Sequence, residues 1–288
     1  MGDRGVPAEP GNIVQGIDHL IVMVRDLDRS QRLWQALGFA PTPRGFHQSG
    51  GTANHLLMLD HTYIELLGMA DPNATSAYRA MAEESPGLWG VALRGTAAAT
   101  YAFWRTQGLD PAAPVSLARG LQIAGHEKLA RFELTMLPRT KDLPFLLFCC
   151  QHLTPELVWR PDLPANPNGA RTLREVFILD HDGVAAAQLA RLTGRAPVGR
   201  TGNSALELGD CRVSLFSPAA LTERFGAGAD VRRGPRPMLA GLALLTSDVE
   251  RARRCAHEAG CSLRTTSEGG FSAYVPDEGV LIEWAQAR

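Results

Sequence analysis

The stretch GIDHLIVMVRDLDRSQRLWQALGFAPTPRGFHQSGGTANHLLMLDHTYIELLG, residues 16–68, decides the fold. It opens on a short, β-branched apolar run, which favours a strand over a helix. Successive side chains of an extended segment alternate between two faces. His19 is then predicted on the same face as Ile17 and Ile21, and both faces of this strand are apolar enough to be buried.

A helix and three further strands follow in the same stretch. The helix is expected to begin after Asp26 or Asp28, whose carboxylates can cap it, and to end at Gly38. The stretch therefore predicts a unit of one strand, one helix and three strands, with His19 on its first strand and Glu65 on its last. Turn residues separate the three later extended segments, which are 45–48, 54–59 and 63–67.

The same order of elements recurs three more times along the chain. Each copy begins with an apolar extended run, continues with a helix and ends with further extended segments. A repeat of this length indicates a duplicated supersecondary unit. A glycine closes the helix of each copy: Gly38, Gly108, Gly194 and Gly260.

The repeat predicts an α+β fold of four βαβββ modules paired into two domains with curved mixed sheets. We expect modules one and two to form a domain over residues 16–153, and modules three and four to form a second, degenerate domain over 172–288. Residues 154–171, which are rich in proline, are predicted to link the domains. Residues 1–15 are polar and are predicted to be a disordered tail. The concave space between two paired modules is a natural ligand site.

Composition excludes several classes of function. The 288 residues carry a formal net charge of −1, so the chain has no overall positive potential that would attract nucleic acid or an anionic membrane. The cationic cluster at 232–236 lies among glycine and proline and is interpreted as a solvated loop. No stretch has the apolar length of a signal-peptide core or of a membrane span, so a cytoplasmic location is expected.

The cysteines predict no disulfide framework. Their number is odd and their spacing forms no zinc-type pair of pairs. We expect them to be reduced thiols, most of them buried. They stand at positions 149, 150, 211, 255 and 261.

Two motifs of module one carry a resemblance to a known family. The segments 16–20 (GIDHL) and 63–67 (YIELL) resemble the vicinal-oxygen-chelate superfamily, which includes glyoxalases, bleomycin-resistance proteins and extradiol dioxygenases. The resemblance implies βαβββ modules with a metal-binding histidine on the first strand and a glutamate on the last. It extends over nearly the whole chain from residue 16. Further segments look like a glyoxalase-like group within the superfamily: 51–54 (GTAN), 150–152 (CQH), 159–160 (WR) and 166–170 (NPNGA).

The resemblance implies His19 and Glu65 as metal ligands. In module two their positions fall at Gly90 and within 148–150, which offer no equivalent histidine and glutamate. In the second domain the position of Glu65 is kept only by Glu283. The other equivalent positions there are Glu175, Ser214 and Gly241.

Each candidate has an alternative role in packing. His19 could be a core histidine that is hydrogen-bonded to Glu65 rather than a ligand. His152 shares strand parity with Phe148 and Cys150, so it either points into the cavity as a third metal ligand or caps a turn. His55 and His61 are interpreted as packing or surface residues. Residues predicted to hold the substrate, for which core packing is the alternative, are Asn54, Tyr63, Trp89, Phe148 and Cys150.

Two classes of function stay open at this point. The first is an enzyme with a divalent metal (Fe, Mn, Zn or Ni) on His19 and Glu65, completed by His152 or by waters. The metal would polarise a carbonyl or enolate of a small oxygen-chelating substrate, with Glu65 as general base, in isomerase- or lyase-type chemistry. The second is a protein without a metal that binds or sequesters a small molecule. Within the enzyme class, an extradiol-type dioxygenase is a further alternative. The second domain is expected to be structural or to form a homodimer surface.

Overall fold

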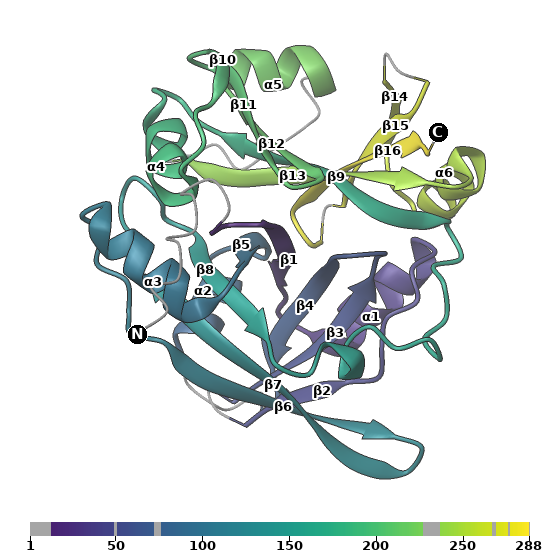
Figure 1. Cartoon of the computed structure of the whole chain (residues 1–288). Helices are drawn as coiled ribbons and strands as arrows, with labels where there is room; N and C mark the ends of the chain where they lie inside the picture. Colours follow the sequence, from purple (N-terminus) through teal and green to yellow (C-terminus); the bar gives the residue numbers. More distant parts are fainter. Residues whose placement is uncertain are drawn as a thin grey trace.

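The computed structural model describes residues 13–48, 51–71, 76–226, 237–266, 269–275 and 277–287. Most of the tail predicted at 1–15 and the cationic cluster at 232–236 lie outside these ranges. The chain folds into two eight-stranded sheets, one closed into a barrel and one open, which lie one above the other (Figure 1). No helix within the described ranges is long and apolar enough to cross a membrane.

The barrel is built from modules one and two. Module one consists of β1 (Gly16–Met23), α1 (Leu27–Ala36), β2 (Gly45–His47), β3 (Thr52–Met58) and β4 (Tyr63–Met69). After α2 (Ala77–Glu84), module two consists of β5 (Gly87–Arg94), α3 (Ala97–Thr106), β6 (Val115–Ile123), β7 (His126–Leu137) and β8 (Leu146–His152).

Two kinds of pairing join these modules. The first and last strands of each module pair in parallel, as β1 with β4 and β5 with β8. Antiparallel pairs of β1 with β5 and of β2 with β6 then close the barrel.

The second sheet repeats the plan without closing. Its first and last strands again pair in parallel, as β9 with β12 and β13 with β16, and β9 pairs antiparallel with β13. Module three consists of β9 (Ala170–Leu179), α4 (Val184–Thr193), β10 (Val198–Arg200), β11 (Asn203–Leu208) and β12 (Cys211–Phe216). After α5 (Pro218–Phe225), module four consists of β13 (Met238–Thr246), α6 (Val249–Glu258), β14 (Leu263–Thr265), β15 (Phe271–Val275) and β16 (Val280–Gln286). The predicted α+β fold of four βαβββ modules is confirmed.

Helix α1 shows why the local sequence produces these units. The Asp26 carboxylate accepts hydrogen bonds from the backbone N–H groups of Asp28 and Arg29, which caps the helix. Trp34 is fully buried on the inner face of the helix. Gly38 follows with φ of 79°, a left-handed conformation that favours glycine and ends the helix.

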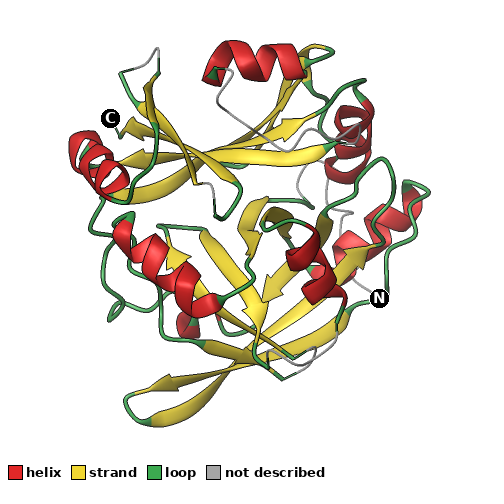
Figure 2. Cartoon of the chain, turned by 180° about the vertical axis from the view of Figure 1, so that it is seen from behind, coloured by secondary structure: helices red, strands yellow, loops and turns green. Residues whose placement is uncertain are grey.

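One hydrophobic core joins the two sheets. It contains residues from the outer face of β1 and β5 and from the face of β9 and β13 that lies toward the barrel. Helices stand at both sides of this junction (Figure 2). Trp104 on α3 is buried there and donates a hydrogen bond from Nε1 to the carbonyl of Leu192 on α4, at 2.9 Å.

The segment predicted as a linker is anchored to both sheets. It contains a short 3-10 turn, η2 (Pro155–Leu157), and its last two residues already belong to β9. Asn166 donates to the Met58 carbonyl at 2.8 Å, and Asn168 donates to the Leu37 carbonyl at 2.9 Å. The domain limits at 153 and 172 stay a prediction.

Candidate functional site

The barrel encloses a cavity of about 260 Å³. Of the predicted site residues, six line it, whereas Trp89 and His152 are not among its described lining residues. The polar side chains of the lining are His19, His47, Thr52, Asn54, Tyr63, Glu65, Tyr78 and Arg119. Its apolar part includes Ile21, Leu67, Leu117, Phe132, Leu134, Met136, Leu146 and Phe148, with Cys150 beside them.

A β-bulge at Asp18 sets the direction of His19. In the pairing with β5, Ile17 is opposite Leu93 and His19 is opposite Ala92, so Asp18 has no partner residue. The extra residue reverses the alternation of side chains. Ile17 therefore packs in the core between the sheets, while His19 points into the barrel. The prediction that Ile17 shares a face with His19 is wrong for this reason.

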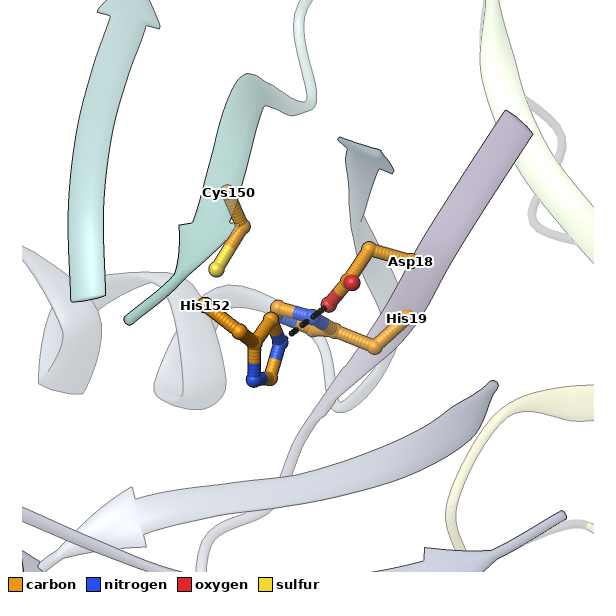
Figure 3. Close-up of side chains that lie close together, drawn as sticks. All are labelled: Asp18, His19, Cys150 and His152. Atoms are coloured by element: carbon orange, nitrogen blue, oxygen red, sulfur yellow. Dashed lines mark hydrogen bonds and ion pairs between the residues drawn. The ribbon is translucent and has the colours of Figure 1, made fainter. Parts of the chain in front are cut away.

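The bulge brings Asp18 into contact with two histidines (Figure 3). His19 donates from Nδ1 to Asp18 Oδ1 at 2.7 Å, and His152 donates from Nε2 to the same oxygen at 2.9 Å. Burial opposes ionisation of Asp18, but these hydrogen bonds and the histidine charges outweigh it, and the pKa of Asp18 is lowered to about 2. A carboxylate only accepts, so Asp18 fixes the proton of His19 on Nδ1 and leaves Nε2 free.

The free nitrogen of His19 faces Glu65. Its Nε2 lies 3.6 Å from Glu65 Oε2, and both side chains are buried. Asn54 donates to the other carboxylate oxygen, Oε1, at 2.6 Å. His47 Nε2 lies 3.7 Å from the same Oε1, and its Nδ1 is 2.8 Å from Thr52 Oγ1. Two imidazoles and one carboxylate thus converge on the cavity wall.

The surroundings of His47 lower its pKa, and the neighbours of His19 fix the orientation of its ring. Burial lowers the pKa of His47, against the opposing charge of Glu65, which favours the neutral imidazole that binds metals. The Tyr63 ring stacks on the His19 ring with centroids 4.5 Å apart and planes within 11°. Phe148 meets the His19 ring edge-on at 5.6 Å. These rings hold the imidazole in one orientation.

His152 belongs to a second group of possible ligands, which shares His19 and Cys150 with the cavity lining. Asp18, His19, Cys150 and His152 each offer one ligand atom, and these atoms lie within 4.8 Å of one another (Figure 3). His152 Nδ1 is buried and has no hydrogen-bond partner among the described residues. Burial raises the pKa of the Cys150 thiol well above its ordinary value. This second donor set would use Nδ1 of His19, whereas the first set uses Nε2.

The remaining predicted candidates lie elsewhere. Trp89 is buried in the barrel core and donates from Nε1 to the Ser85 carbonyl at 2.6 Å. His55 points away from the cavity, with Nδ1 at 2.7 Å from the Thr42 carbonyl. His61 is exposed in the turn between β3 and β4. All five cysteines are free, and all but Cys255 are buried.

Module two lacks an equivalent pair of ligands. Ile21 pairs with Glu65 in the parallel register of module one, and Ala92 pairs with Phe148 in that of module two. The positions of His19 and Glu65 therefore correspond to Gly90 and Phe148, as the sequence predicts.

The second sheet carries its own polar group at the equivalent positions. Arg224 on α5 donates from Nη2 to Glu175 Oε2 at 2.8 Å and to Glu283 Oε2 at 2.7 Å. Its Nη1 donates to Glu175 Oε1 at 3.0 Å. Ser214 also donates to Glu175. The two glutamates at these positions, Glu175 and Glu283, are thus bound to a guanidinium of the same chain.

Comparison with known proteins places the chain in a family. The family described as "Glyoxalase-like domain" matches residues 17–193, which is more than half of the sequence. The chain belongs to the glyoxalase-like domain family. None of the curated proteins matches the sequence. The vicinal-oxygen-chelate resemblance is confirmed by this match together with the fold.

Solved structures share this fold at low identity. A hypothetical protein from Staphylococcus aureus has a TM-score of 0.64 at 11% identity, with 94% of this chain and 99% of that chain covered. A mutant of 4-hydroxymandelate synthase from Streptomyces coelicolor has a TM-score of 0.59 at 13% identity, with 94% and 92% covered. A fusion of a xylose isomerase-like TIM barrel with 4-hydroxyphenylpyruvate dioxygenase has a TM-score of 0.56 at 17% identity. This chain is covered to 99% in that match and spans about half, 51%, of the fusion protein.

Proposed function

We propose that this glyoxalase-like protein is a metal-dependent enzyme that acts on a small oxygen-chelating molecule in the barrel cavity. The observation that carries the proposal is the approach of His19 Nε2 to Glu65 Oε2 at 3.6 Å on the cavity wall. An imidazole nitrogen and a carboxylate oxygen that face each other in a buried cavity suit a divalent ion such as Zn²⁺, Fe²⁺, Mn²⁺ or Ni²⁺.

The neighbours of these two residues fit the same ion. A metal-bound histidine ordinarily donates its other ring N–H to a carboxylate or carbonyl, as His19 does to Asp18. His47 supplies a third donor, since its Nε2 is 3.7 Å from Glu65 Oε1. Two histidines and one carboxylate are also the donor set of non-haem iron oxygenases. With His47 as the second histidine, a dioxygenase is the alternative enzyme class.

The residues around the cavity have different roles in the proposed reaction. When bound, the metal would polarise a carbonyl or enolate oxygen of the substrate. Asn54 occupies Oε1 of Glu65, so Oε2 is the oxygen that would hold the metal and, once released from it, would accept a proton as general base. The apolar wall that includes Phe132, Leu134 and Phe148 excludes water from the ligand.

Metal analysis of untagged protein tests the proposal. We expect about one ion per chain in the wild type and loss of metal in His19→Ala and Glu65→Gln. His61→Ala is the matched control, because His61 is exposed outside the cavity, and it should keep the metal.

Two further variants separate the donor sets. His47→Ala should lower metal content if the ion sits at Glu65, and His152→Ala should lower it if the ion sits among Asp18, Cys150 and His152. Absence of metal after incubation with manganese, iron, nickel and zinc would contradict the metal proposal.

A second candidate function is a metal-free small-molecule binder. It is favoured by Gly90 and Phe148, which occupy the positions of His19 and Glu65 in module two and cannot complete a symmetric site. A wild-type protein that takes up no metal yet binds small organic molecules in the cavity would support this candidate over the enzyme.

A further inference from the structure

An arginine is buried in the wall of the barrel cavity. Arg119 on β6 is 7% exposed and lines the cavity. The other β6 residues that face the same way, Val115 and Leu117, are apolar. A guanidinium taken out of water on such a strand is costly unless an anion or a set of acceptors compensates it.

The described protein supplies little compensation. Arg119 Nη1 donates to Asn54 Oδ1 at 3.3 Å, its Nε is buried without a hydrogen-bond partner, and no described carboxylate lies within 4.0 Å of it. Burial lowers the pKa of Arg119, and the nearby Tyr63 and Glu65 only partly offset this. By contrast, Arg224 in the second sheet binds two carboxylates.

The strand opposite Arg119 leaves room for this side chain. Gly45 on β2 lies so close that a Cβ there would stand 2.9 Å from Arg119 Cδ and 2.7 Å from Asn54 Oδ1. Real Cβ atoms do not approach other heavy atoms this closely, so a larger residue at position 45 would displace both side chains. The position of Arg119 therefore depends on the absence of a side chain at Gly45 and on the neighbouring Asn54.

We infer that Arg119 binds a carboxylate of the cavity's ligand, which makes the ligand a small organic acid with an apolar body. The inference rests on the proposed use of the cavity as the ligand site. A planar guanidinium with free donors matches the two oxygens of a carboxylate. Phe132, Leu134 and Phe148 in the cavity lining offer an apolar surface to the rest of the molecule.

The first test compares an acid with its uncharged analogue. The probes are 3-phenylpropionate and 3-phenylpropanamide, with dissociation constants measured by ligand-observed NMR at neutral pH. We expect the wild type to bind the acid about tenfold or more tightly than the amide, as a charge-assisted hydrogen bond implies. Arg119→Gln should abolish this preference, and Arg119→Lys should keep part of it. Arg44→Gln, which removes a guanidinium outside the cavity, should keep all of it.

The second test separates Arg119 from the metal. The same titrations are repeated with His19→Ala and with chelator-treated wild type. A preference for the acid that persists in both supports the inference even if the metal proposal fails. Loss of the preference on metal removal would place the carboxylate on the metal and overturn the inference. Equal affinity for acid and amide, or no binding of either at millimolar concentration, also overturns it.

The third test excludes a purely structural role. A buried guanidinium that lacks a carboxylate partner in the protein stabilises the unliganded fold little, so Arg119→Gln should leave the urea unfolding midpoint unchanged or raise it. A lower midpoint in Arg119→Gln together with a retained preference for the acid would assign Arg119 to the architecture of the barrel and overturn the inference.

Discussion

The barrel and the second sheet place a carboxylate at the same position and use it differently. Glu65 on β4 and Glu283 on β16 each stand on the strand that pairs in parallel with the first strand of their module. Glu65 faces His19 and an open cavity. Glu283 is bound by Arg224, which also binds Glu175. In the barrel the carboxylate is thus accessible to a ligand in the cavity. In the second sheet an arginine of the same chain already binds the equivalent carboxylate.

The helix that follows the first module of each pair produces the difference. Helix α2 follows β4 and contributes Tyr78 to the cavity lining. Helix α5 follows β12 and covers the face of the second sheet that lies away from the barrel (Figure 1). The Arg224 guanidinium lies over the rings of Phe177 and Phe225, 4.8 Å and 5.0 Å from their centroids. A cation between carboxylates and aromatic faces is well stabilised there.

Removal of Arg224 is expected to have the largest effect. Arg224→Met leaves Glu283 buried without its cation and leaves Glu175 only the longer contact with Arg212 Nε at 3.9 Å, and breaking such a buried pair costs about 3–5 kcal/mol. We expect a loss of this size in the free energy of unfolding, measured by urea denaturation. Arg105→Ala is the matched control, because it breaks an exposed ion pair with Asp110 that contributes about 1 kcal/mol or less.

A combined variant sharpens this prediction. Replacing Arg224 together with Glu175 and Glu283 by methionine removes the guanidinium and both carboxylates, so no unpaired buried charge remains. Such a replacement is often neutral or stabilising. The combined variant should therefore be more stable than Arg224→Met alone. If Arg224→Met were as stable as the wild type, the second sheet would not depend on its internal cation.

The local sequence predicted the modules and one pair of residues, His19 and Glu65, that lie together in the cavity lining. The apolar run around His19 and the motif around Glu65 are visible within single strands, so both residues and the fold could be found. Asp18 is adjacent to His19, but nothing in the sequence singled it out as a partner of His19. No sequence pattern marked the bulge that turns it inward.

Residues that long-range pairing brings to the site could not be predicted in the same way. His47 and Arg119 are opposite each other where β2 pairs with β6. This pairing joins two modules and closes the barrel, and neither strand carries a motif. Arg224 is brought to Glu175 by the packing of α5, a helix between modules three and four that the repeat did not predict. Local patterns therefore give elements, whereas sites that several elements share need the tertiary contacts.

The junction between the two regions offers a pH test of intermediate size. Glu278, in the turn between β15 and β16, is 5% exposed. Burial raises the pKa of Glu278 from 4.5 to about 7, against the smaller opposing effects of Ser30 and Trp34 on α1. The folded protein therefore holds a proton that the unfolded chain has released between these two pH values. Stability should fall as pH rises through this window.

Glu278→Gln removes this dependence. The stability of the variant relative to the wild type should increase by about 3 kcal/mol between pH 4.5 and pH 7.5, at 1.36 kcal/mol for each unit of pKa. Urea denaturation at several pH values measures the difference. A constant difference across the range would show that the Glu278 carboxyl ionises equally in both states.

The smallest expected effect concerns the support of His19 in the barrel. Asp18→Asn replaces a carboxylate that accepts from His19 and His152 by an amide that can also donate. Loss of such a partner behind a metal-bound histidine ordinarily lowers metal affinity about 10- to 100-fold. Competition with a chromogenic zinc chelator measures this change. Asp162→Asn, at an exposed pair with Arg160, is the control and should bind zinc as the wild type does.

Cys150→Ser decides which nitrogen of His19 the metal uses. If the ion lies on Nε2 beside Glu65, Cys150 is no ligand and its replacement should leave zinc affinity nearly unchanged. If the ion lies among Asp18, Cys150 and His152, both Asp18→Asn and Cys150→Ser remove a ligand and both should lose more than about 100-fold in affinity. Unchanged affinity in Asp18→Asn would contradict both placements. The barrel would then resemble the second sheet in using its carboxylate without a metal.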